Sequence, residues 1–252
     1  MASTDLGTTL TAQHRLDQLR LRTAAARDLL LLFRLFDPAD ISGTWATIEP
    51  VLVALIQARQ PMSAALAARY VTEFRRAEQV AGNANAALAA PLTADDIVPN
   101  LRYVGAQNAL RLDQLKRPAS YVAQTTMTRV EGEVTRQILN GGRTTLVDTV
   151  RNDRKARGYT RVTDGAPCAF CALLAGRGPV YNSEASADFH AHGKCGCTAE
   201  PVYFTDAPWS PSAAKWDSLY SEAAKAVPRS TPDWSAEVRR EFRRRYEATA
   251  TT

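Results

Sequence analysis

All four cysteines of this chain and two of its three histidines lie in one short stretch, in the order Cys168, Cys171, His190, His192, Cys195 and Cys197. In a C-x2-C pair, two thiolates on one tight turn can reach the same ion. The later H-x2-C-x-C run supplies the remaining ligands from a second turn. Thiolates combined with imidazole favour zinc among the common divalent ions. Because four protein ligands leave no open position for chemistry, the pattern predicts a structural zinc site.

The stretch offers more ligands than a tetrahedral ion needs. Six side chains compete for four positions, and His190 is the most easily dismissed. One of Cys195 and Cys197 is then also spare, either as a buried bystander or as a thiol hydrogen-bonded to a ligand. The sequence leaves open which one it is. The predicted metal residues are Cys168, Cys171, His192, Cys195 and Cys197.

Two other interpretations of the cysteines compete with metal binding. A thioredoxin-like redox pair needs its C-x-x-C at the start of a helix that follows a strand, and it needs no second Cys and His cluster downstream. Two disulfides would require an oxidising compartment. Residues 1–9 have neither the basic region nor the apolar region of a signal peptide, so we expect no export by that route.

Composition sets wide bounds on the protein. A chain of 252 residues with 45% hydrophobic residues can bury a sizeable core as one large domain or two modest ones. The longest unbroken apolar runs, 51–56 and 168–175, fall far short of the roughly 20 residues of a membrane span, so we expect no transmembrane segment. A net charge of +5 favours an acidic partner, most often nucleic acid, although mild basicity is also common in ordinary soluble proteins.

The first 155 or so residues have the composition and the three- and four-residue apolar spacing of helices. We expect a first helix over about 10–36, with Leu16, Leu19, Thr23, Ala26 and Leu30 on its apolar side. The other predicted helices lie at about 42–60, 61–80, 93–117, 120–139 and 144–154. Pro61 separates the second from the third, a loop over 81–91 follows the third, and Asn140-Gly141-Gly142 ends the fifth.

After Gly158 the sequence changes character. Short β-prone pieces at 160–163, 178–181 and 199–204 are flanked by turn residues and bracket the cysteine cluster, and two helices are predicted at about 212–226 and 233–248. The predicted fold is a mainly α N-terminal helical region followed by a small α+β domain stapled by zinc, with short strands and C-terminal helices. The expected divisions are 1–155, a helical docking and assembly region; 156–208, the zinc-binding α+β core; and 209–252, the C-terminal helices.

Three segments together carry a family resemblance: RVTDGAPCAFC at 161–171, GRGPVY at 176–181 and HGKCGCTAEP at 192–201. The chain resembles the Mu F-like minor head (phage head morphogenesis) proteins of tailed bacteriophages, in the form carried by phages of actinobacteria. The match covers roughly residues 140–205. The resemblance implies a minor capsid protein that joins the procapsid near the portal vertex and accompanies DNA at packaging or ejection. It also implies portal and procapsid proteins as partners, and a location in the virion, and in the host cytoplasm during assembly.

The family's C-x2-C corresponds to Cys168 and Cys171, and its histidine and paired cysteines correspond to His192, Cys195 and Cys197. Many members have proline and arginine in the form H-P-x-C-R-C, where this chain has Gly193 and Gly196. The change leaves the metal ligands untouched. It removes a positive side chain between the cysteines, so a contact with DNA or a partner through that arginine is not implied here.

Some relatives of this family are labelled capsid maturation proteases, which makes proteolysis the alternative function. A protease needs a nucleophile and a base within hydrogen-bond reach. His192 is unsuitable as a base while it binds zinc, no G-x-S-x-G elbow occurs, and the chain lacks the strand content of a herpes-type capsid protease. Cys168 or Cys171 with His190 is the least implausible pair. We expect an assembly protein and not an enzyme.

Two basic runs are candidates for phosphate contact: Arg151, Arg154, Lys155, Arg157 and Arg161, and then Arg239, Arg240, Arg243, Arg244 and Arg245. A solvated helix face paired with Glu237, Glu241 and Glu247 is the favoured interpretation of the second run. DNA binding, if present, is expected to be weak, non-specific and electrostatic. His14, among polar neighbours, is expected to be an exposed helix residue, and no membrane partner is expected.

Overall fold

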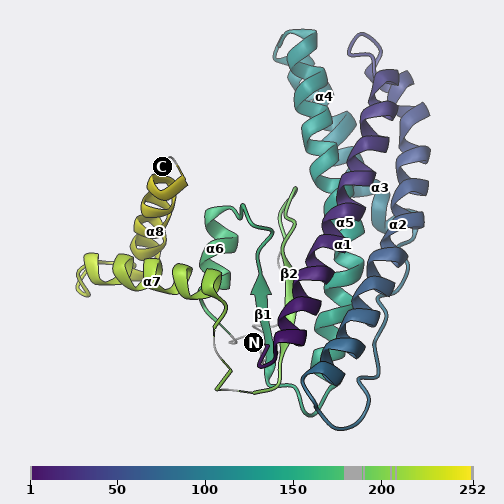
Figure 1. Cartoon of the computed structure of the whole chain (residues 1–252). Helices are drawn as coiled ribbons and strands as arrows, with labels where there is room; N and C mark the ends of the chain where they lie inside the picture. Colours follow the sequence, from purple (N-terminus) through teal and green to yellow (C-terminus); the bar gives the residue numbers. More distant parts are fainter. Residues whose placement is uncertain (1, 179–188, 190, 205, 208, 251–252) are drawn as a thin grey trace.

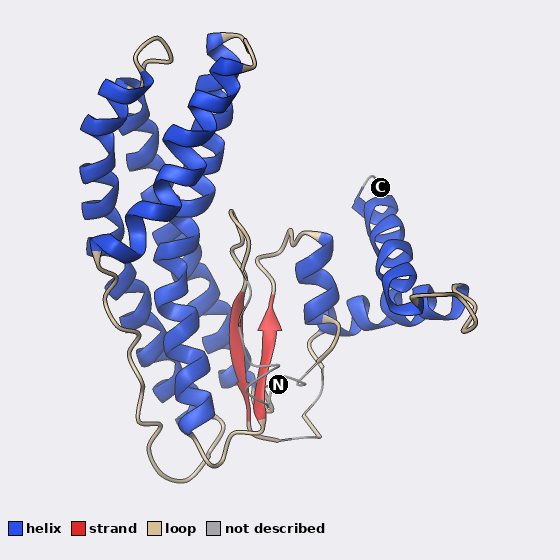
Figure 2. Ribbon diagram, turned by 180° about the vertical axis from the view of Figure 1, so that it is seen from behind, coloured by secondary structure: helices blue, strands red, loops and turns tan. Residues whose placement is uncertain are grey.

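The computed structural model describes residues 2–178, 189, 191–204, 206–207 and 209–250. Its elements are α1 (Asp5–Leu32), a 3-10 turn (Phe33–Leu35), α2 (Ile41–Ala77), α3 (Ala94–Arg102), a π-helical turn (Tyr103–Gln107), α4 (Asn108–Gln114), α5 (Ala119–Asn152), β1 (Gly158–Val162), α6 (Ala169–Ala175), β2 (Thr198–Val202), α7 (Pro211–Ala226) and α8 (Trp234–Ala250). The helices α1 to α5 form one long bundle, and the two strands lie beside its lower half (Figure 1). The strands β1 and β2 form a two-stranded ribbon. Seen from behind, this ribbon lies between the bundle and α6, with α7 and α8 beyond (Figure 2). The predicted mainly helical fold with a small α+β part is confirmed.

Helix α1 begins earlier than expected because the Thr4 side chain accepts a hydrogen bond from the Gly7 amide and caps it. Its predicted inward face is wrong. Leu16 is 41% exposed and Leu30 53% exposed. The buried face is instead formed by Gly7, Thr11, His14, Gln18, Leu21, Ala25 and Leu29. Polar groups on the neighbouring elements select this face: Thr11 bonds the Tyr70 hydroxyl, and Gln18 bonds Ser63.

Helix α2 is continuous, so the predicted break at Pro61 is wrong. Pro50 and Pro61 both lie inside it. Each proline removes one backbone donor and disfavours a helix interior. Burial offsets that cost, because Ile48, Leu52 and Ile56 are fully buried in the bundle core. By length and composition alone α2 would also be long and apolar enough to cross a membrane.

Helix α5 is likewise continuous, and its predicted end at Asn140-Gly141-Gly142 is wrong; the segment expected as a separate helix is its last part. The two glycines serve close packing. A Cβ on Gly141 would lie 2.3 Å from the Gln60 carbonyl oxygen, and one on Gly142 would lie 2.7 Å from Ser63 Oγ. The Gly142 amide donates to Ser63 Oγ at 3.0 Å, and that hydroxyl donates to Gln18 Oε1 at 2.7 Å. The glycines therefore let α5 cross α2 with backbones in contact.

The predicted start of the helix after Thr93 is confirmed. Thr93 and Asp96 form a reciprocal capping box at the start of α3. The π-helical turn after α3 places Gly105 against the indole of Trp45, where a Cβ would lie 1.9 Å from the ring. Pro118 then precedes α5, as the sequence indicates.

The strands β1 and β2 pair antiparallel, with Gly158 opposite Val202 and Val162 opposite Thr198. They confirm the predictions at 160–163 and 199–204, whereas most of the third predicted piece, 178–181, lies outside the described residues. Two strands of five residues are at best marginally stable alone. Tyr159 and Ala199 join a buried cluster with Phe74 of α2 and Leu146 of α5. The bundle therefore supplies the second layer that the ribbon needs.

The two predicted C-terminal helices are present as α7 and α8. They pack with α6 around a separate cluster that contains Trp216, Val238 and Phe242. This third cluster fixes α6, which carries the C-x2-C pair.

Candidate metal centre

The register of the ribbon brings the two halves of the cysteine cluster together. Val162, at the end of β1, pairs with Thr198, at the start of β2. The chain that leaves β1 reaches Cys168, and Cys197 comes directly before β2. Both halves therefore meet at the same end of the ribbon.

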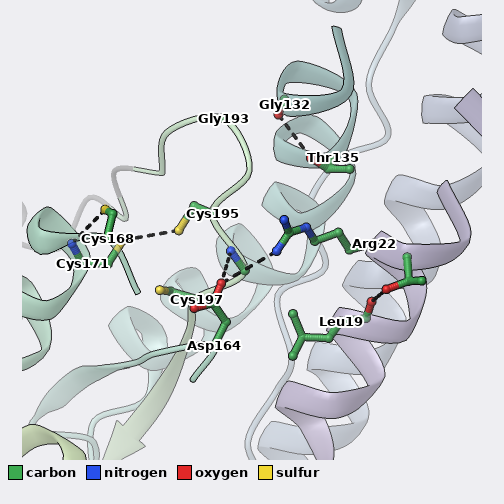
Figure 3. Close-up of polar contacts among 12 residues, drawn as sticks. Leu19, Arg22, Gly132, Thr135, Asp164, Cys168, Cys171, Gly193, Cys195 and Cys197 are labelled. Carbon is green, nitrogen blue, oxygen red and sulfur yellow. Dashed lines mark hydrogen bonds and ion pairs between the residues drawn. The ribbon is translucent and has the colours of Figure 1, made fainter. Parts of the chain in front are cut away.

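All five predicted metal residues are brought together there, as Figure 3 shows for the four cysteines. His192 Nε2 lies 2.8 Å from Cys168 Sγ and 3.6 Å from Cys171 Sγ. Cys171 Sγ lies 3.5 Å from Cys195 Sγ. Two overlapping triads result, and both contain Cys171: one with Cys168 and His192, the other with Cys195 and Cys197. His190 lies outside the described residues.

These distances can be compared with a tetrahedral zinc site. Zinc–sulfur and zinc–nitrogen bonds of about 2.3 and 2.0 Å give edges of roughly 3.8 Å between two sulfurs and 3.5 Å between sulfur and nitrogen. The separations of Cys171 from Cys195 and from His192 fit those edges, while Cys168 and His192 lie closer together. The cluster can therefore hold a metal ion after a small movement of Cys168 or His192. Cys197 Sγ lies within 4.8 Å of both Cys171 Sγ and Cys195 Sγ, so either Cys195 or Cys197 can complete the site.

The centre has a buried half and an exposed half. Cys171, Cys195 and Cys197 are 1%, 4% and 2% exposed, whereas Cys168 and His192 face solvent. An ion can enter from the side of Cys168 and His192, and the buried thiols lie at the contact with the bundle.

The protonation of the thiols follows from their mutual contacts. Hydrogen bonding to Cys171, and then to Cys197, holds the pKa of the Cys195 thiol far below its usual value. Hydrogen bonding to Cys195 correspondingly raises the pKa of Cys171. Burial works against ionisation of Cys168, but the Cys171 amide and His192 lower its pKa overall. Hydrogen bonding to Cys171 lowers the pKa of Cys197, but hydrogen bonding to Cys195 and burial together raise it to about 12. Thiolate is the form of cysteine that binds metals, so a bound ion would have to displace the protons of Cys171 and Cys197.

One requirement of the redox alternative is met. Cys168 is the N-cap of α6, its sulfur accepts the Cys171 amide at 3.5 Å, and the pair follows β1. The close partner of the Cys168 sulfur is His192, however, and that of the Cys171 sulfur is Cys195. All four cysteines are free thiols, so the disulfide interpretation is not supported.

Side chains that the sequence did not single out anchor the turn before β2. Arg143 of α5 donates from Nε to the Cys197 carbonyl at 3.0 Å and from Nη2 to the Cys195 carbonyl. Asp164 accepts the Gly196 amide at 3.0 Å. A Cβ on Gly196 would lie 2.6 Å from Asp164 Oδ2 and 2.8 Å from Leu19 Cδ2, so a larger residue at Gly196 would require these two side chains to shift. The adjacent Gly141-Gly142 is the one local signal of close packing near Arg143.

The prediction for His14 is wrong. It is 3% exposed, its ring stacks on Tyr70 at a centroid distance of 4.4 Å, and Nε2 lies 3.1 Å from Thr198 Oγ1. Burial lowers the pKa of His14 to about 4. His14 therefore ties α1 to the residue that follows Cys197.

Both basic runs are exposed except for the half-buried Arg245 and the buried Arg161. Arg161, counted with the first run, is 3% exposed and lies over the Phe189 ring at 3.8 Å, so it is unavailable to a phosphate backbone. On α8, Arg244 and Arg245 pair with Glu241, and Arg240 pairs with Glu237. These pairs match the predicted solvated face, and DNA binding remains a prediction.

Comparison with known proteins gives one match. No curated protein and no solved structure matches the chain. Residues 7–223 match the family described as VG15 protein, a span that runs from α1 into α7 and includes the whole cysteine cluster. Because that span is most of the chain, the protein belongs to the VG15 protein family, a family of phage gene products.

Proposed function

We propose that this protein is a minor capsid (head morphogenesis) protein of a tailed bacteriophage. It acts at the portal vertex in procapsid assembly and in genome packaging or ejection, and it carries a structural zinc ion. The observation that supports this role best is the Cys and His cluster, whose ligands come from two turns and join the ribbon to α6. Membership of a phage protein family and the resemblance of residues 140–205 to Mu F-like proteins support the same role.

The chain's own residues define what zinc would do. Cys168 and Cys171 would bind from α6, and His192 with Cys195 or Cys197 would bind from the turn before β2. The ion would supply a cross-link between these two segments. With four protein ligands the coordination sphere is closed, which favours a structural role over a catalytic one.

The bundle offers surface for partners. Large apolar side chains are exposed near its end away from the ribbon: Leu31, Leu35, Leu115 and Tyr121 are 59%, 56%, 57% and 48% exposed. Apolar surface of this kind is often buried on a partner. We propose the portal and procapsid proteins as these partners, with the protein in the virion and, during assembly, in the host cytoplasm.

Quantitative mass spectrometry of purified virions tests the role. A full-length, low-copy virion component is the expected result. Absence from virions whose capsid proteins are cleaved would overturn the proposal and favour a maturation protease.

One contact supports proteolysis as a second candidate function. The exposed Cys168 sulfur lies 2.8 Å from His192 Nε2, while His192 Nδ1 is 2.7 Å from the Gly193 carbonyl oxygen. A thiol with an oriented imidazole is the arrangement of a cysteine nucleophile and its base. The sequence pattern pairs a cysteine with His190, which lies outside the described residues. Among the described residues, the imidazole next to Cys168 is that of His192. A phage with Cys168→Ser distinguishes the functions: heads with uncleaved capsid proteins would indicate a protease, whereas normal cleavage with fewer assembled heads supports the structural role.

A further inference from the structure

We infer that Arg143 is a positioning residue of the metal centre: from helix α5 it holds the turn that carries Cys195 and Cys197 in the geometry that binds zinc. This inference rests on the zinc site proposed above and adds the residue that couples that site to the bundle.

The contacts of Arg143 form a clamp. Its Nε and Nη2 reach the carbonyl oxygens of Cys197 and Cys195, two residues apart on the same turn. Its Nη1 donates to Asn140 Oδ1 at 2.9 Å, which fixes the guanidinium to its own helix. A planar fork with donors in fixed directions can hold two carbonyls in one orientation, which a lysine ammonium cannot do. The clamp therefore sets where both sulfur-bearing residues point.

Charge supports the same role. Arg143 is 3% exposed, and a buried cation requires nearby negative charge. Zinc held by three thiolates and one imidazole carries roughly one net negative charge. A second buried guanidinium, Arg161, has Nη1 3.9 Å from Cys171 Sγ, so positive groups lie on two sides of the thiols.

The clamp depends on the continuity of α5. Gly141 and Gly142 face α2, and the next residue along the helix is turned toward the ribbon. A helix that ended at Asn140, as the sequence suggested, would not present Arg143 to the turn. The packing of α5 on α2 is thereby linked to the geometry of the cysteines.

The experiment measures zinc affinity of the full-length protein by competition with a chromogenic chelator, and the absorption spectrum after substitution with Co²⁺. Arg143→Met should weaken zinc binding about 10–100-fold, the usual effect of removing a group that orients metal ligands. Arg143→Lys keeps the positive charge but loses the planar guanidinium. We therefore expect its zinc affinity to lie between that of the wild type and that of Arg143→Met. Arg136→Met is the matched control, because Arg136 lies on the same helix, pairs with Glu133 and, among the described residues, makes no hydrogen bond or ion pair with the cysteines. It should leave zinc affinity and the cobalt spectrum unchanged.

The cobalt spectrum separates positioning from general stability. Distorted ligand geometry in Arg143→Lys should change the visible bands while the far-ultraviolet circular dichroism stays that of the wild type. If Arg143→Met does not fold, Arg143→Lys decides alone. Wild-type affinity together with a wild-type cobalt spectrum in Arg143→Lys, or in a folded Arg143→Met, would overturn the inference. A wild-type protein that binds no zinc would overturn the metal centre as well, whereas the copy number in virions tests the assembly role separately.

Discussion

The two ends of the helical bundle are stabilised in different ways. At the end away from the ribbon, α1 to α5 and the turn between α1 and α2 pack side chains such as Leu52, Ile97 and Val130 into one cluster. At the other end, Phe74 of α2 and Leu146 of α5 share a cluster with Tyr159, Phe189 and three of the cysteines. The first core contains no side chain from the strands. The second core is complete only when the ribbon and its cysteine turn are in place.

This difference bears on the expected division near residue 155. Side chains from both sides of that point lie in one hydrophobic cluster. A fragment of residues 1–155 would expose Phe74 and Leu146 to water, at a cost of roughly 1.5–3 kcal/mol for each large apolar side chain. Tests of portal binding are therefore better made with the full chain and surface variants of the bundle than with fragments.

Loss of the metal should give the largest effect, and it should act at the ribbon end. Cys171→Ser removes the ligand that both triads share. We expect loss of zinc by elemental analysis and a large fall in Tm, because a structural zinc ion can contribute on the order of 10 kcal/mol to folding. Hydrogen exchange should increase over 158–175 and 195–204 and change little over 122–138. Wild-type protein treated with chelator is the control, and metal-free protein with the Tm of the zinc form would contradict a structural ion.

Truncating one core side chain at each end of the bundle should distinguish the two ends. Leu52→Ala should cost about 2–5 kcal/mol and Phe74→Ala about 3–5 kcal/mol in the free energy of unfolding, since both residues are fully buried. Chemical denaturation measures both. Only Phe74→Ala should also weaken zinc binding, because its ring packs near Tyr203 within the cluster that contains the cysteines. Equal zinc affinities in the two variants would contradict the prediction that only the core at the ribbon end supports the metal centre.

At the crossing of α5 over α2, position 141 should tolerate no side chain larger than that of glycine. Gly141→Ala places a Cβ 2.3 Å from the Gln60 carbonyl oxygen, and backbone can move little. We expect a loss of about 3 kcal/mol, the upper part of the range for overpacking. Gly132→Ala, on the same helix with its nearest neighbour, the Gly193 Cα, at 3.3 Å, is the control and should cost much less than Gly141→Ala in urea unfolding. A neutral Gly141→Ala would mean that the helices are less closely packed.

The smallest effect is a pH dependence from His14. Its pKa falls from 6.5 to about 4 on folding, so the unfolded chain takes up the proton first as pH falls. The contribution of neutral His14 to the free energy of unfolding is fully present above pH 6.5 and decreases between about pH 6.5 and pH 4. The decrease is on the order of 2 kcal/mol from pH 7 to pH 5. Asp17 and Arg69 modulate the shift. Subtracting the pH profile of His14→Gln from that of the wild type isolates the effect, and parallel profiles would exclude it.

Features that depend on neighbouring residues in the sequence were predicted well. The helix start after Thr93, the break at Pro118 between two helices, the two strands and both C-terminal helices all follow from local propensity. The five candidate ligands lie close together, because C-x2-C and H-x2-C-x-C spacing places side chains on two short turns regardless of the rest of the fold. That they bind a metal stays a prediction.

Other features depended on surfaces that the sequence does not display. Pro61 and Gly141 read locally as helix ends, yet burial between helices keeps both helices continuous. The inward face of α1 is polar in its first half, where hydrogen bonds to Ser63, Tyr70 and Thr198 select it, and the apolar spacing therefore predicts the wrong side.

The sequence by itself thus determined which residues can bind a metal, since ligand type and short spacing are local properties. Only the tertiary structure decided how those residues are held. Arg143 and His14 lie far from the cysteines along the chain, and they reach the turn before β2 because α5 and α1 pack beside it. Contacts between distant segments arise from the packing of whole surfaces, which no short stretch of sequence specifies.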